Sequence, residues 1–223
     1  MAELIRGLRV EVVRANLERV RAEIARRRGR PDAVEVLAAT KYVAGEELGV
    51  LAAAGVTLLG ENRAQDLLAK QRLHPEGFTW DFIGHLQSRK VRDLVGRVRY
   101  IHSVASDSAL AALKRHGTPQ TRVLVEVNVA GEPGKSGIAP EELAGFLGRC
   151  PVTVAGLMTM PPLARDPEQS RPHFAALREL AARHGLRELS MGTSQDYLVA
   201  VEEGATIVRL GTSLYLEREG RAS

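Results

Sequence analysis

The first thirty residues place apolar side chains at roughly helical spacing between arginines and glutamates. The apolar positions of this stretch are Leu4, Ile5, Leu8, Val12, Leu17, Val20 and Ile24. Such spacing is typical of an amphipathic helix with one face toward a core. Gly29 and Pro31 follow, and a glycine at a helix end with a proline beyond it is a stop signal. The pattern predicts a leading helix over residues 1–30.

A regular alternation of short apolar runs and longer amphipathic segments begins after this helix. We expect strands at 34–41, 56–62, 79–84, 100–104, 122–129, 152–160, 189–192 and 207–211. We expect helices between them at 46–54, 64–73, 86–95, 107–115, 140–147, 167–184 and 195–203. The strand runs are apolar on both faces, which is typical of a parallel sheet covered by helices.

Eight such strands predict the fold class α/β and, within it, a single-domain (β/α)8 TIM barrel. The last strand has no helix after it, so we expect the leading helix to fill the eighth place. The alternative architecture is an open, doubly wound sheet. We expect residues 1–223 to form one domain, because no Pro/Gly/Ser-rich linker divides the chain.

Composition and charge restrict the location and partners of the protein. The net charge is +4, but the basic residues are dispersed, and aromatic residues make up only 4%, too few to stack nucleic-acid bases. The single cysteine, Cys150, excludes an internal disulfide and has no neighbour that would make its thiol reactive. No signal peptide or membrane-spanning run is visible. We expect a cytoplasmic protein that binds neither nucleic acid nor membrane.

Lys41 is the first candidate for chemistry, because it ends the first expected strand. In barrels of this class the active site lies at the C-terminal ends of the strands. Lysine is rare here, with five lysines among 31 basic residues. A lysine amine can lose its proton and attack a carbonyl, which arginine cannot do. The alternative is an ion pair between Lys41 and Glu61 at the barrel rim.

Two Gly-Thr-Ser sequences, at 192–194 and 211–213, follow the seventh and eighth strands. The loops after these strands often bind phosphate in this fold, through backbone amides and helix N-termini. Strand 8 neighbours strand 1 in a closed barrel, which would place Lys41 beside the amides of Gly211 and Thr212. A phosphate there and an aldehyde at Lys41 match pyridoxal 5'-phosphate (PLP), held as a Schiff base. The alternative is that both sequences are ordinary turns.

Arg209 is the charged residue within the apolar run of the eighth strand. Strand alternation puts Arg209 and Gly211 on the same side. If that side faces the mouth, Arg209 can donate to the pyridine nitrogen of PLP and disfavour protonation of that nitrogen. The cofactor would then stabilise carbanions weakly. The alternative is that Arg209 faces the helices and pairs with Glu202 or Glu203.

A Gly-Lys-Ser sequence at 134–136 resembles the end of a nucleotide-binding P-loop. The full pattern needs a glycine five positions before Gly134, where this chain has Val129, so we reject a P-loop. Lys135 remains a candidate second cation at the mouth. No His/Cys/Asp/Glu cluster has metal-ligand spacing, and we expect no metal.

Taken together, these residues resemble the YggS/PROSC family of pyridoxal-phosphate homeostasis proteins over essentially the whole chain. The matching sequences are LAATK (37–41), GEN (60–62), FIGHLQS (82–88), KSG (135–137), GLM (156–158), MGTS (191–194) with Asp196, and VRLGT (208–212). The resemblance implies a barrel like the N-terminal domain of alanine racemase. It implies that PLP is bound by Lys41, Asn62, Ser194, Arg209, Gly211 and Thr212.

Three residues depart from the family's usual pattern. Asp81 stands where the family has histidine, Arg89 where it has asparagine, and Thr193 where it has methionine. We expect Asp81 and Arg89 to change details of the rim or surface. Thr193 adjoins the expected phosphate loop, where it would alter hydrogen bonds.

Three functions are compatible with this site. The resemblance favours a PLP-binding protein of intracellular PLP homeostasis without established turnover, with PLP-dependent apo-enzymes as recipients. The second is a PLP-dependent amino-acid racemase. In such racemases a β-rich second domain carries a catalytic tyrosine; we expect no such domain after this barrel, and Tyr215 is a poor substitute for that base. The third is an aldolase that uses Lys41 directly on a sugar phosphate. We expect a monomer, and the roles of His85 and Lys135 stay open.

Overall fold

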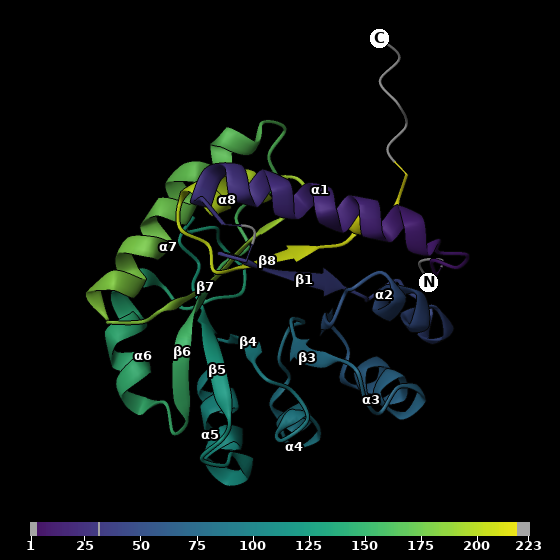
Figure 1. Cartoon of the computed structure of the whole chain (residues 1–223). Helices are drawn as coiled ribbons and strands as arrows, with labels where there is room; N and C mark the ends of the chain where they lie inside the picture. The colour runs from purple at the N-terminus through teal and green to yellow at the C-terminus, as the bar shows by residue number, and fades with distance from the viewer. Residues whose placement is uncertain (1–3, 31, 218–223) are drawn as a thin grey trace.

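A computed structural model of the protein describes residues 4–30 and 32–217, and its centre is a closed barrel of parallel strands (Figure 1). The strands found within these residues are β1 (Glu35–Ala39), β2 (Leu58–Glu61), β3 (Thr79–Phe82), β4 (Ile101–Val104), β5 (Arg122–Glu126), β6 (Thr153–Met158), β7 (Glu188–Thr193) and β8 (Ile207–Leu210). They are hydrogen-bonded in sequence order. The barrel closes because β1 pairs with both β2 and β8, with Leu37 opposite Arg209. The TIM barrel is thereby confirmed, and an open sheet is excluded.

Helices surround the barrel in the order expected for this fold (Figure 1). Those of the described residues are α1 (Val10–Arg28), α2 (Leu48–Ala53), α3 (Ala64–Leu73), α4 (Val91–Leu94), α5 (Asp107–His116), α6 (Leu143–Arg149), α7 (Arg171–Arg183), α8 (Tyr197–Glu202) and α9 (Thr212–Tyr215). Short 3-10 turns precede four of them: η1 (Gly45–Glu47), η2 (Ser88–Lys90), η3 (Pro140–Glu142) and η4 (Pro167–Ser170).

The leading helix fills the last place in the ring, where α1 packs along α8 and α9. It begins at Val10, so the expectation of a helix from residue 1 was wrong. Ile5 instead bridges to Val43 in parallel fashion, which ties the segment before the helix to the loop after β1. The helix ends at Gly29, whose φ of 78° is left-handed and suits glycine. Residues 1–3 and Pro31 lie outside the described residues.

Two further helices differ from the sequence prediction. The segment 86–95 forms η2 and the single turn α4, because Leu86 is drawn into the core before the helix begins. The helix after β7 begins at Tyr197 instead of Gln195, because residues 194–196 form a turn. Among residues 4–30 and 32–217 no helix has both the length and the apolar character that crossing a membrane requires.

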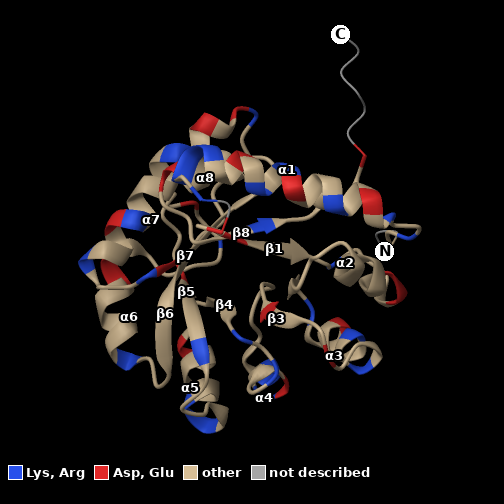
Figure 2. Ribbon diagram, viewed as in Figure 1, with Lys and Arg blue, Asp and Glu red and all other residues tan. Residues whose placement is uncertain are grey.

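Apolar side chains form two layers. The barrel interior holds a small cluster of Leu37, Tyr100, Leu124, Met158 and Ile207, and a much larger layer lies between the strands and the helices. Charged residues are spread over the outer faces of the helices, with both signs interspersed (Figure 2). Cys150 is half-buried at the end of α6, and burial raises the pKa of its thiol, as expected for an unreactive cysteine.

Candidate functional site

The six residues predicted to bind the cofactor line one cavity of about 600 Å³. They come from four places in the barrel: Lys41 follows β1, Asn62 follows β2, Ser194 follows β7, and Arg209, Gly211 and Thr212 belong to β8 and the start of α9. All these places are at C-terminal strand ends, so the cavity occupies the barrel mouth. Its size is within the ordinary range for a small-molecule site.

Lys41 is exposed at the mouth, two residues beyond β1. Its Nζ lies 4.8 Å from the ring centroid of Tyr42, and no acidic partner of Lys41 is found among the described residues. The predicted alternative, an ion pair with Glu61, is wrong. The Glu61 carboxylate is taken by Lys70, whose Nζ lies 2.6 Å from Oε2. The Lys41 amine therefore remains available to a ligand.

The Glu61–Lys70 pair also supports the backbone that carries Lys41. Lys70 Nζ donates a second hydrogen bond of 2.7 Å to the carbonyl oxygen of Thr40. The Thr40 hydroxyl lies 3.2 Å from the carbonyl oxygen of Gly60 and 3.3 Å from the Glu61 carboxylate, and its hydrogen bond is shared between them. Thr40, Glu61 and Lys70 are buried, and buried polar groups need hydrogen-bond partners inside the protein, which these three residues supply to one another. The end of β1 is thus fixed to β2 just below the mouth.

The Ser194 hydroxyl lies where two backbone amides point into the mouth. Its Oγ accepts from the amide of Gly211 at 3.2 Å and from that of Ser213 at 3.4 Å. Converging amides of this kind would also receive the oxygens of an anion. Ser213 Oγ lies 3.0 Å from Ser194 Oγ, which joins the two Gly-Thr-Ser loops. Ser213 was not predicted as a binding residue, although it ends the second of these sequences.

Thr193 is not available to an anion in this arrangement. Its amide donates to Asp196 Oδ1 at 2.8 Å, and its hydroxyl donates to the same oxygen at 3.1 Å. Asp196 also accepts from Ser170. The substitution at position 193 therefore builds the turn before α8 and leaves the Ser194 hydroxyl free to face the amides.

Gly192 brings α8 close to the end of β7. Its φ is 91°, and a Cβ at this position would lie 2.6 Å from the Cβ of Ala200 and 3.0 Å from the Cα of Tyr197. Only glycine combines this backbone conformation with so close an approach. The glycine thus has a packing role that places Ser194, and it supplies no ligand atom itself.

Arg209 is buried inside the barrel and faces the mouth. Its NH1 donates to the carbonyl of Ser190 at 2.8 Å and to the Ser190 hydroxyl at 2.5 Å, and its NH2 donates to the carbonyl of Thr159 at 2.9 Å. Burial lowers the pKa of Arg209 to about 10, so the guanidinium stays charged at neutral pH. The hydrogen bonds that Arg209 makes within the described residues use NH1 and NH2, and the side chain lines the mouth cavity, so Arg209 can also interact with a ligand there.

The alternative position for Arg209, on the helix side with Glu202 or Glu203, is wrong. Glu202 pairs with Arg171 and Arg27, and Glu203 pairs with Arg171 and Arg178. These ion pairs lie between α7, α8 and α1 on the outside of the barrel.

Asp81 lies in the barrel interior with no solvent exposure, so its expected place at the rim or surface was wrong. Its Oδ2 is 3.0 Å from Nε2 of His102, whose Nδ1 is 2.9 Å from the hydroxyl of Ser190. Burial by itself would raise the pKa of Asp81, but hydrogen bonds from His102 and Arg99 lower it. Asp81 is therefore ionised and accepts the proton of His102 Nε2.

The charges fix the direction of this buried chain of hydrogen bonds. Burial lowers the pKa of His102, so the ring is neutral and its Nδ1 accepts from the Ser190 hydroxyl. Ser190 Oγ in turn accepts from Arg209. At the other end, Arg99 donates to Asp81 and reaches Glu35 at the N-terminal edge of the barrel. The guanidinium of Arg209 is thus oriented by three side chains that prediction from the sequence missed.

The other residues singled out in the sequence lie partly at the mouth and partly outside it. Gly84 packs on Asn62, since a Cβ on Gly84 would lie 2.0 Å from the Asn62 carbonyl oxygen. His85 lines the same cavity as Lys41. Lys135 lines a neighbouring cavity of about 290 Å³, where its Nζ is 3.5 Å from Glu132. Arg89 lies on the outside of the barrel.

Tyr215 also lines the mouth cavity, with its hydroxyl donating to the carbonyl of Ala39 at 3.1 Å. Burial raises the pKa of Tyr215 above its ordinary value. Its proton is therefore held at the end of β1. No group of three or more His, Cys, Asp or Glu side chains that could hold a metal ion occurs in the described part of the chain.

Comparison with known proteins identifies relatives over nearly the full length. The chain is 40% identical over 217 residues to the pyridoxal phosphate homeostasis protein of Aquifex aeolicus, which covers 91% of this chain and 95% of the relative. It is 36% identical over 224 residues to the protein of the same name from Pseudomonas aeruginosa, with 94% and 97% covered. No family model matches the chain.

Solved structures agree with these sequence relatives. PipY of Synechococcus elongatus PCC7942 without PLP has a TM-score of 0.82 at 32% identity and covers 92% of this chain and all of PipY. The structure of PipY with PLP bound has a TM-score of 0.78. Alanine racemase from Corynebacterium glutamicum shares the fold, with a TM-score of 0.73 at 18% identity over 66% of that chain. Identity of 40% over nine-tenths of the sequence shows that this chain belongs to the family of pyridoxal phosphate homeostasis proteins.

Proposed function

We propose that this protein binds PLP at the barrel mouth and serves PLP homeostasis without turning over a substrate. The observation that carries the proposal is one cavity that joins Lys41, the loop of Ser194 and Gly211, and Arg209. An amine, an anion-binding loop and a cation match the aldehyde, phosphate and ring nitrogen of PLP. The names of the relatives and the PLP-bound PipY structure support the same ligand.

Each residue has a distinct part in this proposal. PLP, when bound, supplies an electrophilic aldehyde that a neutral lysine amine can attack. Lys41 is the nucleophile, and it is free of acidic partners among the described residues. Ser194, Gly211 and Thr212 hold the phosphate, and Ser213 assists them with its amide. Arg209 would supply a cation to the ring nitrogen, and Asn62, which follows β2, would contribute to holding the ring.

The charge of Arg209 and the hydrogen bond of Tyr215 favour a PLP carrier over a racemase. Arg209 is a buried cation, which disfavours protonation of the ring nitrogen that carbanion chemistry needs. Tyr215 already donates its proton to Ala39 and has a raised pKa, so it is poorly suited as a base. We propose further that the whole chain is one domain, acts as a cytoplasmic monomer and passes PLP to apo-enzymes.

The deciding experiment is the absorption spectrum of the purified protein with and without added PLP. We expect a violet band that borohydride removes, and we expect Lys41→Ala to lack it. Lys135→Ala is the matched control, since Lys135 lies in the neighbouring cavity and pairs with Glu132. A featureless spectrum with excess PLP would overturn the proposal and leave a lysine-dependent aldolase acting on sugar phosphates. Turnover of an amino acid by the loaded protein would instead favour the racemase.

A further inference from the structure

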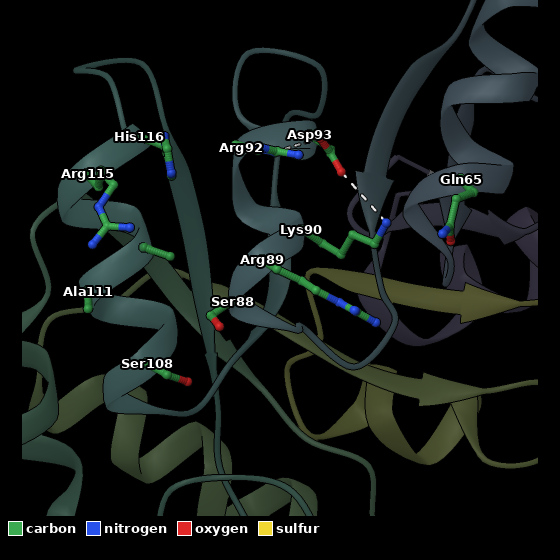
Figure 3. A pocket seen from close by; sticks show the side chains of 11 residues that line it. Gln65, Ser88, Arg89, Lys90, Arg92, Asp93, Ser108, Ala111, Arg115 and His116 are labelled. Atoms are coloured by element: carbon green, nitrogen blue, oxygen red, sulfur yellow. Dashed lines mark ion pairs between the residues drawn. The ribbon is translucent and has the colours of Figure 1, made fainter.

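A further open hollow lies on the outside of the barrel, separate from the cofactor cavity. It has a volume of about 660 Å³ and runs between α4 and α5, with Gln65 of α3 at its edge (Figure 3). Arg92 and Asp93 project into it from α4, and Arg115 and His116 from α5 (Figure 3). We call it the α4–α5 groove.

The helix on one side of the groove is short compared with its two neighbours. The α4 helix has 4 residues, whereas its neighbours α3 and α5 have 10 each. Val91 and Leu94 of α4 are fully buried against the barrel, so the short helix still covers the strands. On the other side of the groove, Ala111 and Ala112 of α5 contribute small side chains to the lining.

The charge of the groove is strongly unbalanced. Its lining includes four basic residues, Arg89, Lys90, Arg92 and Arg115, but one acid, Asp93. Asp93 is shared, at 3.8 Å from Lys90 and 3.5 Å from Arg92. Arg89 donates only to the amide oxygen of Gln87, and Arg115 makes no hydrogen bond or ion pair within the described residues. At least two guanidinium groups therefore lack an anionic partner.

This arrangement selects the kind of partner. Arg89, Arg92 and Arg115 are exposed and come from three elements, η2, α4 and α5, whereas Lys90 is half-buried beside Asp93. A single phosphate needs donors that converge, so these arginines suit a more extended anionic partner. Among the described residues that line the groove there is no Phe, Tyr or Trp, and single-stranded nucleic acid is usually held on such rings. A groove beside small side chains and rimmed by cations suits the charged face of an acidic helix. We propose that the α4–α5 groove docks an acidic segment of a partner protein.

The groove adjoins the mouth through one short loop. Ser88, at the groove, is three residues beyond His85, which lines the cofactor cavity. Between them Leu86 is buried, and before them Gly84 packs on the backbone of Asn62. A segment docked in the groove would therefore lie beside the exit of the mouth. This role as a docking surface for a recipient of PLP rests on the proposed function, but the binding of an acidic segment does not.

The test measures fluorescence anisotropy with a short, labelled, helix-forming peptide rich in glutamate, and with its glutamine counterpart. We expect the full-length protein to bind the glutamate peptide in a salt-dependent manner. The double variant Arg89→Glu with Arg115→Glu should bind about tenfold more weakly, since two attractions become repulsions. The matched control is Arg26→Glu with Arg28→Glu, which makes the same charge change at exposed positions on α1 and should change binding less than about twofold.

Hydrogen exchange locates the peptide, and we expect slower exchange over residues 88–94 and 107–116. Equal weakening by both double variants would overturn the proposal, because net charge alone would then explain binding. No binding by the wild-type protein would overturn it as well, as would a single-stranded oligonucleotide that binds more tightly and depends on the same arginines. Lys41→Ala separates the two proposals, since it should abolish the PLP band while leaving peptide binding intact.

Discussion

Lys70, in the last turn of α3, neutralises Glu61 at the end of β2 and so leaves Lys41 without an acidic partner among the described residues. Both members of the pair are buried, and Glu61 has no solvent exposure at all. A buried carboxylate must be paired, so the protein uses one lysine for structure and a second lysine, exposed at the mouth, for chemistry. The reactive amine is thus kept available by a residue that never contacts the ligand.

Replacing Lys70 by alanine should therefore destabilise the protein strongly. The change removes the only cation paired with the buried Glu61 carboxylate among the described residues, together with one donor to the Thr40 carbonyl, and we expect a loss of about 3–5 kcal/mol in the free energy of unfolding. Urea unfolding followed by circular dichroism measures it. Lys114→Ala, at an exposed position of α5, should change stability by less than about 0.5 kcal/mol. Similar stabilities for the two variants would contradict a structural role of the pair.

The buried His102 predicts a loss of stability in mild acid. Burial lowers its pKa below the ordinary value of 6.5, so the unfolded chain binds a proton that the folded protein excludes. Stability should therefore be full above about pH 6.5 and fall below it, by up to about 1.4 kcal/mol per pH unit. Unfolding curves at several pH values between 8 and 5 give this slope.

Two variants isolate the contribution of His102. His102→Asn should lower stability at pH 8, because the Ser190–Asp81 connection is weakened, but it should flatten the slope between pH 7 and 5. His184→Asn changes an exposed histidine after α7 and should keep the slope of the wild-type protein. If the slope is the same in all three proteins, His102 is not the group that titrates.

Gly192→Ala tests how the phosphate loop is positioned. The added Cβ would lie 2.6 Å from the Cβ of Ala200, on a backbone with a left-handed φ of 91°. Together these should lower the free energy of unfolding by about 2–5 kcal/mol. We also expect weaker PLP binding, because α8 and Ser194 must shift. Gly49→Ala is the control. Gly49 lies in α2 with open space around it, so alanine there should stabilise the protein slightly. Unchanged stability of Gly192→Ala would show that β7 and α8 can separate at no cost.

Much of the fold could be predicted because parallel strands buried on both faces appear as apolar runs. Every expected strand overlaps an observed one, from 34–41 with Glu35–Ala39 to 207–211 with Ile207–Leu210. Helix ends were less predictable, since they depend on tertiary contacts. The α4 helix is short because Leu86 leaves the expected helix to enter the core, and no local pattern distinguishes that leucine from a helical one.

The site divides in the same way. Lys41, Ser194 and Arg209 could be found because barrel closure brings strand ends together whatever the loops do. The hydrogen bonds that support Arg209 could not be predicted, because Asp81, His102 and Ser190 lie on three strands and meet only in the folded interior. One signal was present. Asp81 and His102 each interrupt an apolar strand, and a polar group buried in such a run requires a partner.

Arg209→Gln tests whether the buried cation controls the bound cofactor. The variant keeps a donor for Ser190 or Thr159 but removes the charge. We expect PLP affinity to fall by about tenfold, which corresponds to the loss of one charge-assisted hydrogen bond. We also expect the ring nitrogen of PLP to be protonated at higher pH than in the wild-type protein, because a neighbouring cation disfavours that proton. An absorption-monitored pH titration of the loaded protein measures this shift. Arg26→Gln, exposed on α1, is the control and should leave affinity and titration unchanged. A titration of Arg209→Gln that matches the wild type would place the ring nitrogen away from the guanidinium, and the charge of Arg209 would then not account for a lack of racemase chemistry.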